Sequence, residues 1–269
     1  MPLVIVPTPI GNLEDVTLRA LRELGEADIV LCEDTRRTKM LFDRHGISAR
    51  TKSFHRHNEA SRTAEVLPLL EADKRIAVAS DAGLPGLNDP GARLVVAALD
   101  RGLPVTVLPG PSAVETALVA SGLVGERYSF LGYLPRTGEA LSRLWEELAG
   151  WTWPVVAFES PQRLPAALRS LSAAHPERLV AVCRELTKRF EEVARGPAVE
   201  LADRFSGPPK GEVTLVIGSA SAGSTPKKER EAAAAVAELT RSGVARKQAA
   251  ELVARLTGVS KNRLYRESL

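Results

Sequence analysis

Short apolar runs alternate with amphipathic stretches along the first half of the chain. The apolar runs predict β-strands at 3–6, 29–32, 76–79 and 104–108, because each is only a few residues long and is followed by turn-forming or charged residues. The stretches between and after them carry Leu, Val and Ala at helical spacing, which predicts helices over 17–25, 39–45, 61–72, 91–99 and 113–120. Strands that alternate with helices predict an α/β fold with a largely parallel sheet.

The second half repeats the alternation less regularly and predicts a second α/β domain. Strands are expected at 128–133, 155–158, 179–184 and 213–217, and helices at 141–148 and 164–173. Gly211 and Gly218 bracket the last of these strands, which favours a hairpin or a place at the edge of the sheet. The predicted domains therefore cover residues 1–112 and 113–219.

The remaining residues differ in composition. Residues 220–226 are rich in Ser, Gly and Ala and predict a linker. Residues 227–269 predict a tail of short helices, either a helix-turn-helix-like unit or a small helical cap or dimer contact. Its expected core consists of apolar residues at helical spacing, namely Val236, Leu239, Leu252, Leu256, Val259 and Leu264.

Charge is uneven along the chain. The tail has a net charge of +5, whereas the whole chain has only +3. An anionic partner is therefore expected to bind the tail. An apolar content of 44% with 26% charged residues excludes a mostly disordered chain and a coiled coil.

Several classes of protein and site are excluded by missing patterns. The N-terminus resembles no signal peptide, and no apolar run is long enough to cross a bilayer, so we expect a cytoplasmic protein without a membrane partner. Cys32 and Cys183 lie in apolar runs and are expected to be buried thiols. The four histidines form no metal-ligand pattern, so no metal is expected. A phosphate-binding P-loop, a G-x-G-x-x-G turn and a G-x-S-x-G elbow are also missing.

Glycine and proline turns follow three of the predicted strands. They are Pro7–Asn12, Ser80–Pro85 and Pro109–Ala113. Because parallel strands end at the same edge of a sheet, these turns should lie together there. Rigid turns that expose backbone N–H and C=O groups predict a site for a small polar ligand.

Motifs in these turns and beyond match a known family in order. They are residues 7–21, Glu33–Arg36, His55–Glu59, Ser80–Pro85 with Asp89–Gly91, Leu108–Ala113, Phe158–Leu164, Arg184–Lys188 and Lys210–Glu212. The chain resembles the tetrapyrrole-methylase-like S-adenosylmethionine-dependent methyltransferases over about its first 218 residues. Within them it is most similar to the ribosomal RNA small-subunit methyltransferase I branch, and the basic helical tail also resembles that branch's extension.

The resemblance implies two α/β domains with S-adenosylmethionine in a cleft between them, and a homodimer. It also implies methyl transfer to the ribose 2′-oxygen of a cytidine in small-subunit ribosomal RNA, either naked or in the assembled subunit. By position, the cofactor contacts would be Ile10, Ala79, Ser80, Asp81, Leu84, Ser112, Ala113, Phe158 and Leu186.

Charged and polar residues after the predicted strands suggest how an acceptor is handled. Glu33 and Asp34 could take the proton of a ribose hydroxyl, or they could simply start a helix with Arg36 and Arg37 as exposed partners. Arg36 and Arg37 are also predicted RNA contacts. A second polar cluster, His55, His57 and Asn58, could bind RNA or be an ordinary polar loop. Asp81 could face the cationic donor or cap its own turn.

Two other functions remain open at this point. One is the same methyl transfer to a tetrapyrrole, and the other is a non-catalytic RNA-binding assembly factor. The basic tail and the charges at 33–37 favour RNA over a tetrapyrrole. The intact turns at Asp81 and at Pro109–Ala113 argue against a protein without catalysis.

Overall fold

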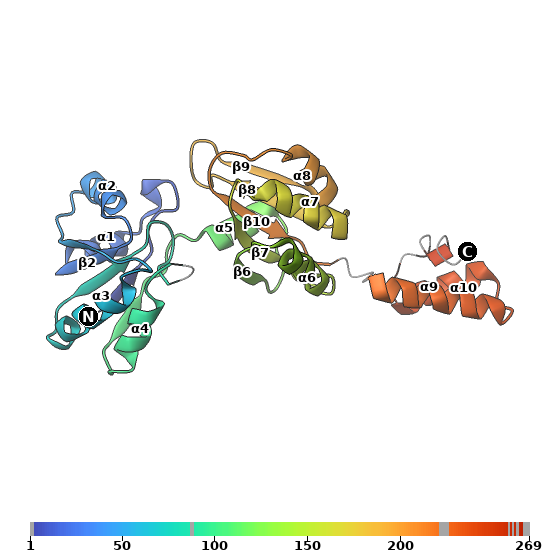
Figure 1. Ribbon diagram of the computed structural model, residues 1–269, viewed down its shortest axis with the longest axis horizontal. Helices are drawn as coiled ribbons and strands as arrows, with labels where there is room; N and C mark the ends of the chain where they lie inside the picture. Colours follow the sequence, from blue (N-terminus) through green and yellow to red (C-terminus); the bar gives the residue numbers. More distant parts are fainter. Residues whose placement is uncertain are drawn as a thin grey trace. The chain divides into compact units, whose positions relative to one another are not determined.

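The computed structural model describes residues 3–86, 89–220, 226–257, 259, 261 and 264–265 (Figure 1). Its contacts group the chain into two compact units, Met1–Ala117 with Arg184–Glu192, and Leu118–Cys183 with Val193–Leu269. The first unit therefore ends a few residues after the boundary predicted at 112. Its second segment, 184–192, comes from the middle of the predicted second domain, and no sequence pattern indicated this insertion. The predicted linker at 220–226 lies mostly outside the described residues.

A five-stranded parallel sheet forms the centre of the first unit, in the order β3-β2-β4-β1-β5. The strands are β1 (Leu3–Val6), β2 (Ile29–Cys32), β3 (Thr51–Ser53), β4 (Ile76–Ala79) and β5 (Val105–Val107). Every residue of β1, β2 and β4 is buried, as expected for a parallel sheet with helices on both faces. The parallel α/β fold is therefore confirmed.

Helices cover both faces of this sheet. They are α1 (Leu18–Gly25), α2 (Thr35–His45), α3 (Glu59–Glu71) and α4 (Ala92–Leu99), with a short 3-10 turn η1 at Leu13–Asp15. Helix α5 (Ala113–Ser121) follows β5 and includes the boundary between the two units. Val66 and Leu94 pack on one face and Leu24 and Leu41 on the other. Helix α2 begins several residues before the predicted position, because Asp34 caps its N-terminus.

A mixed five-stranded sheet forms the centre of the second unit, in the order β6-β7-β10-β8-β9. The strands are β6 (Ser129–Tyr133), β7 (Val155–Glu159), β8 (Leu179–Arg184), β9 (Glu192–Pro197) and β10 (Val213–Ile217). The prediction that β10 is an edge or hairpin strand is wrong, because this fully buried strand lies between β7 and β8. Its Gly218 allows close strand packing instead: a Cβ there would lie 3.0 Å from the carbonyl oxygen of Leu179.

Three helices pack on the second sheet and enclose its core. They are α6 (Gly138–Leu148), α7 (Leu164–Ala174) and α8 (Ala198–Arg204). The buried Arg178 joins the end of β10 to this layer, since its guanidinium donates to the carbonyls of Gly218 at 2.6 Å and Leu148 at 3.0 Å. Burial lowers the pKa of Arg178 to about 10.

The tail has a small core of its own, between α9 (Pro226–Arg241) and α10 (Arg246–Thr257). Val236, Val259 and Leu264 are buried there, as predicted. The prediction for Leu252 and Leu256 is wrong, because they are 38% and 75% exposed. Small residues occupy the contact instead, namely Ala232, Ala249 and Ala250. Among the described residues, no helix has both the length and the apolar character to span a bilayer.

Candidate active site

The turn after β1 meets the turns after β4 and β5. The backbone of Thr8 bridges to Gly83, each N–H donating to the other's carbonyl at 2.9 Å. A Cβ on Gly83 would lie 3.6 Å from Ile10 Cγ2 and 3.7 Å from the carbonyl oxygen of Pro111. The three turns therefore converge, as expected from the place of β1 between β4 and β5.

Glycine is required at two positions of this contact. Gly83 has a φ of +75°, which side-chain-bearing residues rarely adopt. At Gly110, a Cβ would lie 2.8 Å from Cβ and Cγ of Pro7, so the turns after β1 and β5 could not approach as closely with a larger residue. The turns are thus rigid and closely packed, with little room for rearrangement.

Hydroxyl groups hold the turns together from inside. Thr8 Oγ1 donates to the carbonyl of Ser80 at 3.0 Å, and Ser80 Oγ donates to the carbonyl of Gly83 at 2.6 Å. Both hydroxyl-bearing residues are buried. Ser80, a predicted cofactor contact, therefore uses its side chain within the turns and could reach a ligand only through its backbone.

The other predicted cofactor contacts of this region differ in exposure. Ile10 and Ala79 are buried, whereas Leu84, Ser112 and Ala113 are partly exposed beside the same turns. Ser112 Oγ bonds to the carboxylate of Glu115 in the first turn of α5. The surface at the strand ends thus combines small and apolar side chains with backbone groups.

The segment 184–192, here called the strap, brings Leu186 to the turn that follows β1. A Cβ on Gly11 would lie 2.8 Å from the carbonyl oxygen of Leu186 and 2.5 Å from Lys188 Cγ. The N–H of Asn12 donates to Thr187 Oγ1 at 3.0 Å. Leu186 is buried, and its place beside residues 10–12 joins a predicted contact from far along the chain to the turns.

The strap contains two left-handed residues that are not glycine. Glu185 has a φ of +53° and Thr187 a φ of +64°. Such conformations cost about 1–3 kcal/mol each and persist only where the surroundings impose them. Here the N–H of Thr187 donates to Glu191 Oε2 at 2.6 Å, and Lys188 Nζ lies 2.9 Å from Glu185 Oε1. Strain of this kind concentrates at functional sites, which fits the position of Leu186 between the two residues.

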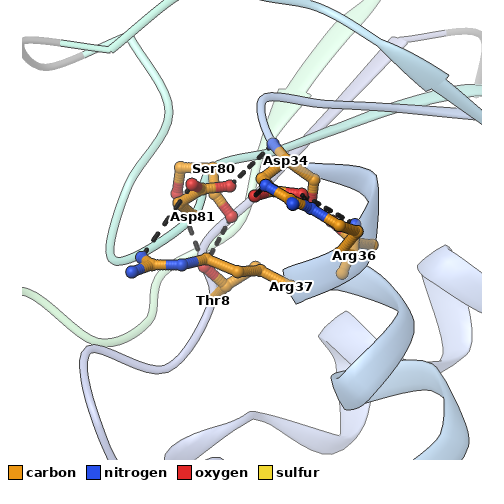
Figure 2. A network of polar contacts seen from close by, with 7 residues as sticks. Thr8, Asp34, Arg36, Arg37, Ser80 and Asp81 are labelled. Carbon is orange, nitrogen blue, oxygen red and sulfur yellow. Dashed lines mark hydrogen bonds and ion pairs between the residues drawn. The ribbon is translucent and has the colours of Figure 1, made fainter.

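Asp34 has a structural task at the start of α2 (Figure 2). Its Oδ1 accepts the N–H of Arg36 at 2.9 Å and Arg36 Nε at 3.0 Å, while Oδ2 accepts Nη2 at 2.8 Å. These bonds to Arg36 lower the pKa of Asp34 to about 2. Asp34 is therefore poorly suited to take a proton near neutral pH. Its position agrees with the alternative that it starts a helix with Arg36 as its partner.

Asp81 connects the end of β4 to the same helix start. Figure 2 shows its carboxylate between the backbone of Asp34 and the side chain of Arg37. Oδ1 accepts the N–H of Asp34 at 2.9 Å, and Oδ2 lies 3.9 Å from Arg37 Nη1. About a quarter of the Asp81 side chain is exposed, at 24%. The carboxylate is thus fixed in direction yet still accessible from solvent.

Asp89 is a candidate site residue that the sequence pattern does not predict, although it belongs to the Asp89–Gly91 motif. Burial raises the pKa of Asp89 to about 6, and the negative charges of Glu33 and Asp81 add to this effect while Arg56 opposes it. The N–H of Gly91 donates to Glu59 Oε1 at 2.9 Å, which ties this loop to α3. Only the fold shows that Asp89 lies near carboxylates from the ends of β2 and β4.

The predicted RNA contacts divide into exposed and structural residues. Arg36, Arg37 and His57 are exposed. Asn58 instead shapes the turn before α3: its Oδ1 accepts the N–H of His55 at 2.8 Å, and its Nδ2 donates to the carbonyl of Ser53 at 3.2 Å. The ordinary-loop alternative thus accounts for the side chain of Asn58.

Phe158 lies in the second unit, on β7, unlike the other predicted cofactor contacts. Its ring meets Phe130 at 5.0 Å and Tyr133 at 5.7 Å between centroids, both edge to face. The next residue, the buried Glu159, pairs with Arg163 at 2.8 Å, and burial raises its pKa.

Comparison with known proteins agrees with this architecture. The family model described as Tetrapyrrole (Corrin/Porphyrin) Methylases matches residues 2–202. A protein of Mesorhizobium japonicum named ribosomal RNA small subunit methyltransferase I is 42% identical, over 99% of this chain and 91% of its own. A protein of the same name from Thermotoga maritima is 43% identical, over 80% of this chain and 97% of its own.

The chain belongs to the tetrapyrrole methylase family, in the group named ribosomal RNA small subunit methyltransferase I. Among solved structures, the uroporphyrin-III C-methyltransferase of Thermus thermophilus, in complex with S-adenosyl homocysteine, shares the fold with a TM-score of 0.58. That structure is 16% identical and covers 82% of this chain and 98% of its own. As a family member this protein is a methyltransferase, and S-adenosylmethionine is its methyl donor.

The residues at the strand ends fit this donor. Gly11 and Gly110 are exposed in these turns, Leu84 provides partly exposed apolar area, and the partly exposed carboxylate of Asp81 suits a cationic ligand. The family model ends at residue 202, before the tail, so the tail lies outside the part of the chain that the family defines.

Proposed function

We propose that this protein methylates the ribose 2′-hydroxyl of a cytidine in small-subunit ribosomal RNA, in the cytoplasm. The observation that carries the proposal is near-full-length similarity, 42% over 99% of the chain, to a relative named ribosomal RNA small subunit methyltransferase I. The ribose 2′-oxygen and the cytidine are what the family resemblance implies. The tetrapyrrole alternative has weaker support, since the T. thermophilus uroporphyrin-III methyltransferase is 16% identical.

We propose that the converging turns and the strap hold the donor. The contacts predicted in the first unit are Ile10, Ala79, Ser80, Asp81, Leu84, Ser112, Ala113 and Leu186, and the resemblance also predicts Phe158 on β7. S-adenosylmethionine supplies an already activated methyl group, so orientation of the reacting atoms is the main requirement. The rigid turns serve this requirement, and Asp81 provides negative charge opposite the sulfonium.

A ribose hydroxyl must lose its proton as the new bond forms. Of the predicted bases, Asp34 is occupied by Arg36, whereas Glu33 is exposed. Asp89 joins Glu33 as a candidate, because its pKa near 6 allows it to be ionised at neutral pH and still accept a proton effectively. We assign proton removal to this pair of carboxylates.

RNA contacts are proposed in two places. Arg36 and Arg37 project from the start of α2 and provide charge for phosphate groups. The tail carries the excess positive charge, +5 over residues 227–269. We propose that the tail binds RNA, because attraction between its positive charge and the phosphate groups does not require a deep site.

We also propose a homodimer. Apolar side chains of α4 and the edge strand β5 remain exposed, namely Val96, Leu99 and Val107, which are each between 53% and 57% exposed. Such a grouping suits burial against a second copy. Light scattering of the full chain tests this, and a monomer at micromolar concentration would refute it.

The function is tested by mapping methylated riboses in small-subunit ribosomal RNA from cells that lack this protein. We expect one cytidine to lose its 2′-O-methyl group and to regain it when the wild-type gene, but not the Asp81→Ala variant, is restored. An unchanged methylation pattern refutes the proposal. Methyl transfer to a tetrapyrrole by the purified protein, without transfer to small subunits, would favour the alternative.

A further inference from the structure

Strand β6 contains an extra residue that changes the direction of its side chains. Phe130 pairs with Val156, but Tyr133 pairs with Phe158, so β6 has one residue more than β7 between these pairs. Gly132 lies in the interruption with a φ of +68°. An extra residue with a left-handed glycine is a β-bulge, a feature that redirects side chains and is common beside functional sites.

The bulge places two aromatic residues on one face of the sheet. In a regular strand, residues three apart point to opposite faces. Here Leu131 and Leu134 both pack on the core of the second unit, whereas Phe130 and Tyr133 both meet Phe158. A protein in which only 4% of residues are aromatic thus gathers three of them at one point.

The outermost ring of this group is accessible. Tyr133 is 60% exposed, while Phe130 and Phe158 are partly buried. Its contact with Phe158 has an interplanar angle of 63°, so this contact covers at most one face of the tyrosine ring. Exposure of so large an apolar surface to water is unfavourable. The bulge keeps the Tyr133 ring in this exposed position.

The surroundings of Tyr133 fit a nucleic acid strand. Arg136 is exposed three residues further on. Arg163 Nη2 donates to the carbonyls of Leu134 at 2.6 Å and Pro135 at 3.1 Å, which fixes the segment after Tyr133. An exposed aromatic ring in a segment that also carries an exposed cation is suited to unpaired nucleotides, because the ring stacks on the base and the cation attracts phosphate.

We propose that Tyr133, supported by Phe130 and Phe158, is a stacking platform for one unpaired nucleobase of the RNA acceptor. This inference rests on the proposed function, since it identifies a place on the second unit where that RNA is bound. It adds a base contact to the phosphate contacts proposed for Arg36, Arg37 and the tail.

The test compares Tyr133→Leu, which removes the ring, with Tyr133→Phe, which keeps it. The substrate is small ribosomal subunits purified from cells that lack this protein. Stacking of one base is worth about 1–3 kcal/mol, so the leucine variant should raise the KM for subunits about 5- to 150-fold. The phenylalanine variant should stay within about twofold of wild type, because a π-face is retained. The Kd for S-adenosylmethionine should be unchanged in both.

Tyr128→Leu provides the matched control, because it removes an exposed tyrosine just before β6 and should leave KM unchanged. Wild-type protein that fails to methylate the subunits refutes the proposed function itself. Active wild type with an unchanged KM in Tyr133→Leu refutes the platform alone. A Kd for S-adenosylmethionine that weakens by the same factor as KM would also overturn it, because the ring would then belong to the donor site.

Discussion

Replacement of Gly11 by alanine tests whether the strap holds the donor site in shape. Alanine is compatible with the backbone, because Gly11 is not in the left-handed region. Its Cβ, however, would lie 2.5 Å from Lys188 Cγ and 2.8 Å from both Thr187 Oγ1 and the carbonyl oxygen of Leu186. Favourable contacts between non-bonded carbon atoms lie at about 3.5–4.0 Å. The two side chains can move aside, but the Leu186 carbonyl can move only if the strap moves.

The expected loss of stability follows from these contacts. Overpacking costs about 1–3 kcal/mol, and loss of the bond from Asn12 to Thr187 Oγ1 adds about 1 kcal/mol. Reduced entropy of the unfolded chain returns about 0.4–1 kcal/mol. We therefore expect Gly11→Ala to lower the free energy of unfolding by about 1–4 kcal/mol. It should also weaken the Kd for S-adenosylmethionine at least about tenfold, a change of about 1.4 kcal/mol, because Leu186 is displaced.

Urea unfolding and calorimetric titration with S-adenosylmethionine measure the two effects. Gly25→Ala is the matched control, since nothing lies within 4 Å of a Cβ at Gly25. This control should be as stable as wild type, or slightly more stable, and should bind the donor normally. If Gly11→Ala behaves like Gly25→Ala in both measurements, the reasoning about the strap is wrong.

Four further outcomes are expected. Asp81→Ala should abolish binding of S-adenosylmethionine in calorimetry while the circular dichroism spectrum is retained, and unchanged affinity would place the donor elsewhere. Asp89→Asn should raise the free energy of unfolding at pH 8 by on the order of 1–3 kcal/mol. The folded chain holds the Asp89 proton more tightly than the unfolded chain does, so the wild-type protein loses stability as the pH rises through about 6 and Asp89 ionises. Asparagine cannot ionise and avoids this loss. The gain should vanish below about pH 4, so an equal gain in urea unfolding at both pH values contradicts the assignment. Arg178→Met should lower the unfolding free energy by about 2–4 kcal/mol, since buried carbonyls lose their donors; a loss below about 0.5 kcal/mol in urea unfolding would contradict this. Removal of residues 227–269 should weaken RNA binding and flatten its dependence on salt in filter-binding assays, and unaltered binding would make the tail structural.

The sequence predicted those elements whose burial leaves a clear pattern. Strands 29–32 and 76–79 are continuous apolar runs because helices cover both faces of the first sheet. Strand β3 was not predicted, since Thr51–Ser53 are polar and only half-buried. Leu252 and Leu256 were assigned to the tail core because they are large and apolar, but alanines make that contact. Local sequence patterns thus predict burial well only where the buried residues have large apolar side chains.

The candidate site was predictable where it depends on strand order. Parallel strands end at one edge, so the convergence of the turns at Thr8, Gly83 and Pro111 follows from the α/β pattern. The insertion of the strap and the environment of Asp89 depend instead on contacts between distant segments. The resemblance named Leu186 as a contact, but only the structure explains how a residue so far along the chain reaches Gly11.

The strap also determines how the molecule can be divided. The chain passes from one unit to the other after Ala117, after Cys183 and after Glu192. A fragment that ends at 117 would therefore lack the piece that covers Gly11, although it would include every strand of the first sheet. Chimeras between relatives inherit the same constraint: exchange of the amino-terminal half must be accompanied by exchange of residues 184–192, or the two surfaces will come from different parents.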